Sequence, residues 1–147
     1  MHELTVRNRI AVLGNTTSPA NDLIMASSHV DDLGFILELS SDAVHQILPT
    51  TLLAEIIKIN NLRMLAMQHQ SPELSAVQDA FSILQRVDAF SSEEWAACKP
   101  ISREDWTLIG ATHHAAVSIY CISSLQSVSL FPCTPSCLLY TSPSPRD

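Results

Sequence analysis

An uncharged stretch near the C-terminal end of the sequence constrains the fold more than any other feature. No residue from Trp106 to Leu130 carries a formal charge, and helix-start signals precede the stretch directly. We therefore predict one buried helix of about 25 residues, roughly 40 Å long. Polar residues interrupt the stretch too often for a membrane span, so a core helix is the better interpretation. These polar residues are Thr112, His113, His114, Ser118, Ser123, Ser124, Gln126 and Ser127.

Two helix starts of the same kind lie side by side before this stretch, in residues 90–95 and 101–106. In each, a serine, Ser91 or Ser102, can accept a hydrogen bond from the amide three residues on, and a nearby acid can reach back. An apolar residue before the serine can pack on the tryptophan that ends the signal. Pro100 separates the two helices because proline cannot continue the first. Each serine is predicted to stabilise the fold by about 1 kcal/mol.

The segment from Thr50 to Met67 carries apolar residues around most of a helix. We predict a helix packed on more than one side. Its polar remainder consists of Glu55, Lys58, Asn61 and Arg63.

A further helix opens at Ser71-Pro72-Glu73, with a cap, a first-position proline and an early acid. Its apolar residues at helical spacing predict one packing face. They are Leu74, Val77, Phe81, Leu84 and Val87. Between Asp22 and Pro49 the pattern allows one or two short helices, broken near Ser40-Ser41-Asp42.

These elements predict an all-α fold, an irregular helical bundle of about five helices, with a long uncharged core helix near Arg103 to Val128. Residues 22–132 form the predicted helical domain, and residues 1–21 a connector or an incomplete N-terminal segment. We expect residues 133–147 to be a non-native or disordered tail. Residues 137–147 resemble the translated read-through of a transposase sequencing adapter, and they carry no further weight in the argument.

Composition excludes several classes of protein. A chain of 147 residues that is 46% hydrophobic, with three glycines, is neither disordered nor a turn-rich β protein. Eight basic against 15 acidic residues give a net charge of -7, which disfavours direct nucleic-acid binding. The four cysteines lack the spacing of a zinc module, and no signal peptide is present, so we expect an intracellular protein.

The sequence predicts no catalytic, cofactor-binding or metal-binding residue. Helical spacing puts His114 and Cys121 on one face, with His113 to one side, but zinc needs at least three ligands in one place. Adjacent acids such as Glu93-Glu94 are better explained by helix first turns, where negative charge is stabilising. A small helical metal-binding protein or enzyme using His113, His114 and Cys121 remains an alternative.

Three segments resemble a known family. They are AEIIKINNLR at residues 54–63, FSSEEWAACKP with SREDW at residues 90–100 and 102–106, and AVSIYCISSLQS at residues 116–127. They resemble the C-terminal part of the fungal-specific transcription factor domain, found in regulators that carry a six-cysteine binuclear zinc cluster. The resemblance extends from about Gly14 to Pro132, and its middle segment is the most specific.

The resemblance implies an all-helical, non-catalytic regulatory domain of a nuclear transcription regulator. The six-cysteine motif is absent from this chain, so no metal ligand or DNA-contacting residue can be transferred to it. The implied partners are the other domains of the parent regulator and a second copy in a homodimer. We expect no cofactor, no membrane contact and no direct nucleic-acid binding, and the effector is not specified. A helical interaction module unrelated to transcription is a further alternative.

Overall fold

The computed structural model describes residues 10–23, 26–38, 47–68 and 74–128. Every regular element in these ranges is helical, which confirms the all-α prediction. The elements are η1 (Ala20–Asp22), α2 (Ala26–Asp31), α3 (Leu33–Glu38), α4 (Thr50–Gln68), α5 (Leu74–Asp88), α6 (Ser92–Ala97) and α7 (Arg103–Ser127). The predicted tail at 133–147, the cap at Ser71 and the break at residues 40–42 lie outside the described residues, and the domain boundaries remain predictions.

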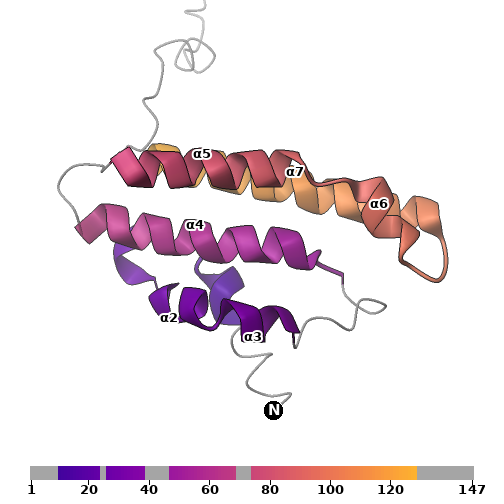
Figure 1. The fold of residues 1–147 in the computed structure, drawn as a ribbon, viewed down its shortest axis with the longest axis horizontal. Helices are drawn as coiled ribbons and strands as arrows, with labels where there is room; N and C mark the ends of the chain where they lie inside the picture. Colours follow the sequence, from indigo (N-terminus) through magenta and orange to yellow (C-terminus); the bar gives the residue numbers. More distant parts are fainter. Residues whose placement is uncertain (1–9, 24–25, 39–46, 69–73, 129–147) are drawn as a thin grey trace, which may run out of the picture.

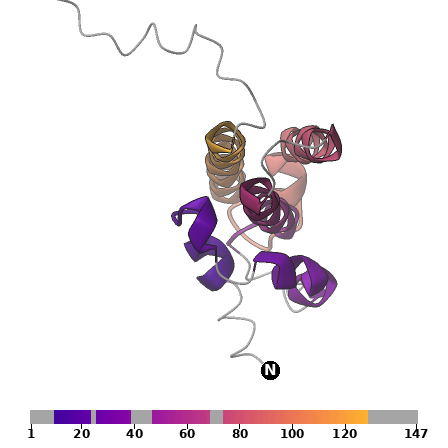
Figure 2. The same cartoon turned by 90° about the vertical axis from the view of Figure 1, so that its left-hand side faces the viewer.

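Helix α4 lies at the centre of the molecule. Figure 1 and Figure 2 show α5 and α7 on one side of it and α2 and α3 on the other. This confirms the prediction of a helix packed on more than one side. Two residues of its polar remainder, Glu55 and Arg63, are buried together with the apolar ones. The buried residues are Leu52, Leu53, Ala54, Glu55, Ile56, Ile57, Ile59, Asn60, Leu62 and Arg63.

Helix α5 packs through a face rotated from the predicted one. Ala80, Ile83 and Val87 are buried, whereas Leu74 and Phe81 are exposed. Of the predicted face, Val87 is buried and Val77 and Leu84 pack partly buried against the core, so only Leu74 and Phe81 turn toward solvent. Apolar spacing alone does not distinguish the two faces.

The two predicted helix starts differ in the structure. The Ser91 hydroxyl oxygen accepts a hydrogen bond from the Glu94 amide at 3.2 Å, as predicted for α6. Ser102 has φ 52° and ψ 59°, a left-handed conformation, and makes no side-chain cap. The prediction for Ser102 is wrong because a capping serine needs an extended backbone to place its oxygen over the helix amides. Here the chain turns sharply from α6 into α7.

Helix α7 has the predicted bounds within one residue, but the prediction that it is buried is wrong for most of its surface. Val117, Cys121 and Leu125 are buried on its inner strip. On the opposite side Leu108 is 69% exposed and Ile119 67% exposed. In the described residues, α7 from Arg103 to Gln126 is long and apolar enough to cross a membrane by length and composition, and 28% of its most apolar window is buried. That property alone does not establish a membrane span.

Candidate functional site

A buried polar network joins α4, α7 and the segment that precedes η1. Arg63 of α4 donates from Nη1 to the Asn15 carbonyl and to the Tyr120 hydroxyl, both at 2.9 Å. Its Nη2 donates to the Ser18 carbonyl at 2.6 Å. The guanidinium carbon lies 5.7 Å from the centroid of the Tyr120 ring, so the cation also faces an aromatic ring. One side chain therefore ties three parts of the chain together.

Asn60, one turn before Arg63, completes the network. Its Nδ2 donates to the Val12 carbonyl at 3.1 Å, and its Oδ1 accepts from the Tyr120 hydroxyl. Burial raises the pKa of Tyr120, against the opposing effect of the Arg63 charge. Tyr120 therefore stays a neutral donor at physiological pH, and the network serves to hold segments in place.

The sequence analysis did not identify this network. Arg63 and Asn60 are polar residues in a helix with apolar residues on nearly every side, and such positions are buried only when they are bonded. This pattern of isolated polar residues in an apolar helix was the only local indication of a buried polar network. The partners were not predictable, because three of them are backbone carbonyls at least 45 residues away.

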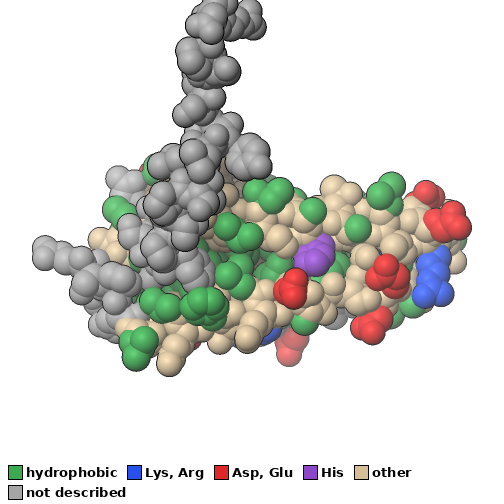
Figure 3. Space-filling view, turned by 90° about the horizontal axis from the view of Figure 1, so that it is seen from above, with side chains coloured by type: hydrophobic (Ala, Val, Ile, Leu, Met, Phe, Trp, Pro, Cys, Tyr) green, Lys and Arg blue, Asp and Glu red, His purple; other side chains and the backbone are tan. Residues whose placement is uncertain are grey.

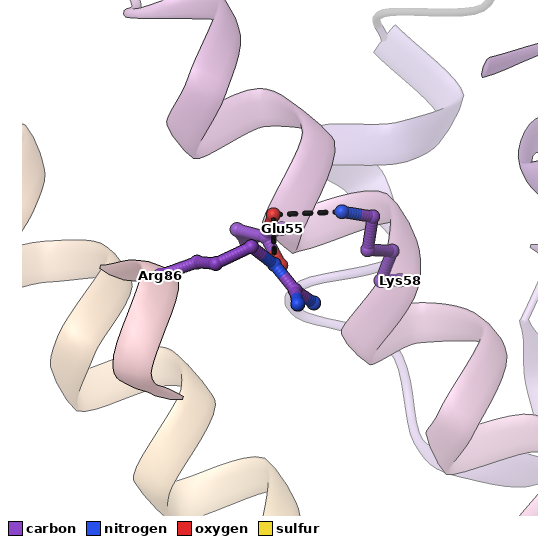
Figure 4. Close-up of polar contacts among 3 residues, drawn as sticks. All are labelled: Glu55, Lys58 and Arg86. Carbon is purple, nitrogen blue, oxygen red and sulfur yellow. Dashed lines mark hydrogen bonds and ion pairs between the residues drawn. The ribbon is translucent and has the colours of Figure 1, made fainter. Parts of the chain in front are cut away.

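A second polar cluster joins α4 to α5 (Figure 4). Glu55 Oε1 accepts from Lys58 Nζ at 2.8 Å and from Arg86 Nε at 2.9 Å. Glu55 is buried, whereas the Lys58 and Arg86 side chains are partly exposed. Two basic groups at the rim thus hold one carboxylate inside, which makes this an anchor between helices.

An aromatic cluster joins α6 to the start of α7. The Trp95 and Trp106 rings meet edge to face with centroids 5.6 Å apart, and Lys99 Nζ lies 4.6 Å and 4.8 Å from their centroids. Partial burial lowers the pKa of Lys99. Gly110 leaves room for this cluster, because a Cβ there would lie 2.9 Å from Trp95 Cε3.

An apolar groove of about 450 Å³ lies between the segment near residue 13, α4 and α7. Its volume is in the range of small-molecule sites. The groove is lined by Leu13, Thr16, Ile47, Leu48, Ile56, His113, Ala116, Val117 and Tyr120.

The three residues of the metal-binding alternative do not converge. Cys121 is fully buried, and burial together with the nearby Glu55 charge raises the pKa of its thiol to about 12. The His114 ring packs against the Phe90 ring, with 5.7 Å between the ring centroids, and His113 lines the apolar groove. Within the described part of the chain, no three His, Cys, Asp or Glu residues are grouped to hold a metal. Cys121 is a packed thiol, unsuited to nucleophilic chemistry.

Comparison with known proteins gives a relative from a fungus. The chain is 43% identical over 129 residues to the phomenoic acid biosynthesis cluster-specific transcriptional regulator of Leptosphaeria maculans. This chain is similar to a fungal transcriptional regulator. The match covers 84% of this chain and 24% of the relative, so the chain spans about a quarter of that protein's length.

No family model matches the chain, and no solved structure matches it. The relative therefore supports the broader part of the resemblance, a fungal transcription regulator. The specific domain remains a prediction.

Proposed function

We propose that this chain is a non-catalytic, helical regulatory segment of a fungal transcription regulator, with DNA contacted by another part of the parent protein. The observation that carries the proposal is the 43% identity over 129 residues to a transcriptional regulator. By analogy with that relative, the parent controls the genes of one biosynthetic cluster. We assign the parent to the zinc-cluster family and to the nucleus on the resemblance of the three sequence segments.

The chemistry of the described residues agrees with a regulatory role. The buried polar side chains Arg63 and Glu55 each bond to other parts of the chain. Arg63 donates to the Asn15 and Ser18 carbonyls, and Glu55 of α4 pairs with Arg86 of α5. Cys121 has a raised pKa in a fully buried position, opposite to an activated nucleophile. The net charge of -7 disfavours contact with a phosphate backbone. These features suit a scaffold whose partners are the other domains of the same regulator.

A chimera tests the proposal. In the Leptosphaeria maculans regulator, the matched quarter is replaced by the corresponding part of this chain, and a reporter driven by a target promoter of that regulator is measured. We expect the chimera to restore reporter expression well above that of a regulator lacking the segment. The same chimera with Arg63→Ala should lose this effect, because the substitution breaks the buried network.

Two results would contradict the proposal. One is a chimera that accumulates normally but activates no better than the deletion. The other is tight, steeply salt-dependent binding of promoter DNA by the purified chain alone, since that would assign DNA contact to this segment.

A further inference from the structure

A cleft of about 270 Å³ lies between α4 and α5, with one further lining residue from α2. We call it the α4/α5 cleft; it is lined by Val30, Lys58, Asn61, Leu62, Leu65, Asp79, Ser82, Ile83 and Arg86. It shares no described lining residue with the apolar groove beside α7. Its volume is near the lower limit of small-molecule sites, so a ligand must be small.

The two ends of the cleft differ in charge. Helices α4 and α5 are antiparallel neighbours, so residues that come later in α4 lie beside residues that come earlier in α5 (Figure 1). Lys58 and Arg86 meet at one end, where both bind Glu55. Leu65 and Asp79 line the cleft seven residues away along each helix, which places the other end about 10 Å from the first.

The end formed by Lys58 and Arg86 has an excess of positive charge. Both donate to the same carboxylate oxygen, Oε1 of Glu55, so one buried acid is shared by two cations (Figure 4). Arg86 uses only its Nε in this contact, and its two Nη groups have no hydrogen-bond partner among the described residues. Glu55 therefore fixes the guanidinium and leaves its outer N–H groups able to bind a carboxylate. The Lys58 and Arg86 side chains are 32% and 47% exposed, so a ligand can reach both.

The middle of the cleft is mainly apolar. Its apolar lining residues are Val30, Leu62, Leu65 and Ile83, and its neutral polar ones are Asn61 and Ser82. Such a lining favours the burial of a hydrocarbon chain. A cationic end followed by an apolar channel is complementary to a carboxylic acid with an apolar body.

The remaining charges limit the ligand to one negative charge. Asp79, at the end away from Arg86, would repel a second carboxylate. The whole chain has a net charge of -7, and in Figure 3 most acidic side chains in view gather toward the end where α6 and α7 begin. A dicarboxylate or a phosphate dianion is therefore disfavoured relative to a monocarboxylate.

We propose that the α4/α5 cleft binds a monocarboxylic acid with an unbranched apolar body about 10 Å long. Its carboxylate is held by Arg86 and Lys58, and its hydrocarbon chain lies between Leu62 and Ile83. This inference goes beyond the proposed function and does not depend on it. Absence of binding would leave the assignment to transcription intact, and an inactive chimera would leave the site intact.

Titration of the whole chain with octanoate, followed by NMR of methyl groups, tests the proposal. We expect the Leu65 and Ile83 signals to shift saturably with a dissociation constant of roughly 0.1 to 1 mM. The signal of Ile119, exposed on α7, should stay unchanged, which locates the binding. Neutral octanamide, which has the same chain length, should bind at least tenfold more weakly because it lacks the charge that Arg86 and Lys58 recognise.

Charge removal in the cleft should weaken octanoate binding. Arg86→Gln should raise the dissociation constant at least tenfold. Arg103→Gln is the matched control, since it removes the same charge from an exposed residue outside the cleft and should leave the affinity unchanged. Lys58→Gln is a second test that leaves Arg86 paired with Glu55. Circular dichroism confirms that each variant keeps its helical content.

Charge reversal at the other end tests the orientation of the ligand. Asp79→Lys should create binding of suberate, the dicarboxylate of the same chain length, whereas Asp88→Lys, outside the cleft on the same helix, should not. The proposal is overturned if millimolar octanoate leaves Leu65 and Ile83 unshifted, or if Ile119 shifts in parallel with them, which would indicate non-specific association. Equal binding of octanamide, or full affinity in folded Arg86→Gln and Lys58→Gln, would also overturn it.

Discussion

Helices α4 and α7 have similar apolar content but opposite surroundings. Helix α4 is covered by neighbours on both sides, and even its Glu55, Asn60 and Arg63 are buried. Helix α7 has neighbours on one side, and its Leu108 and Ile119 are largely exposed. The burial of a helix therefore depends on how many neighbouring elements pack against it. The apolar content of the helix itself determines only how favourable that burial is in free energy.

The side chains of the two helices also differ in their surroundings. Polar groups inside the molecule around α4 are satisfied by specific partners and fix the positions of the surrounding segments. Apolar side chains on the outer side of α7, such as Leu108 and Ile119, are largely exposed in the described chain. The predictions below test this contrast, from the largest expected effect to the smallest.

Removal of Arg63 should have the largest effect. Arg63→Ala leaves the Asn15 and Ser18 carbonyls and the Tyr120 hydroxyl without their donor, so we expect a loss of roughly 4 kcal/mol in the free energy of unfolding. Lys58→Ala is the control and should cost about 1 kcal/mol or less, because Lys58 is partly exposed and Arg86 still pairs with Glu55. Urea unfolding followed by circular dichroism measures both. Equal losses would mean that the network does not anchor the fold.

The same substitution at one isoleucine of each helix compares them directly. Ile57→Ala in α4 should cost about 3 kcal/mol, since the side chain is 1% exposed and leaves a cavity. Ile119→Ala in α7 should change stability by less than about 0.5 kcal/mol, because the side chain is 67% exposed. A large loss at Ile119 would show that its side chain is covered.

Two glycines test the contact between α6 and α7. Alanine favours a helix over glycine by about 1 kcal/mol, so Gly34→Ala in α3, where the new Cβ meets open space, should stabilise the protein. Gly110→Ala in α7 should destabilise it by about 1 to 2 kcal/mol, because the new Cβ would contact the Trp95 ring and Ser92 Cβ. Thermal unfolding gives the sign. Stabilisation by both changes would place Trp95 away from α7.

The two serines at the helix starts should also differ in sign. Ser91→Ala removes a cap and should cost about 1 kcal/mol. Ser102→Gly should cost nothing and gain up to about 0.5 kcal/mol, because glycine tolerates the left-handed conformation of this residue. Equal losses at both positions would restore the expectation of two equivalent caps.

His29 of α2, on the side of α4 away from α7, should make the stability of the protein depend on pH. Burial lowers the pKa of His29 in α2, despite the nearby Asp32 charge. The unfolded chain therefore binds this proton more tightly, and stability should fall as pH drops below about 6.5, the ordinary pKa. His29→Leu should flatten this part of the stability profile between pH 7 and pH 5. An unchanged profile would mean that His29 does not titrate with folding.

Local signals in the sequence predicted the helices well. The start of α6 at Ser91, the apolar circumference of α4 and the bounds of α7 follow from capping chemistry, periodicity and the absence of breakers. What depends on distant partners was missed: the left-handed turn at Ser102, the rotated face of α5, and the burial of Glu55 and Arg63. The carbonyls that accept from Arg63 belong to residues 15 and 18, and nothing local at Arg63 indicates them.

The most direct test of the contrast between α4 and α7 is the solvent accessibility of isoleucine methyl groups, measured by NMR with a soluble paramagnetic agent. We predict strong broadening for Ile119 and Ile122 and none for Ile57 and Ile59. Protection of Ile119, or broadening of Ile57, would contradict the account.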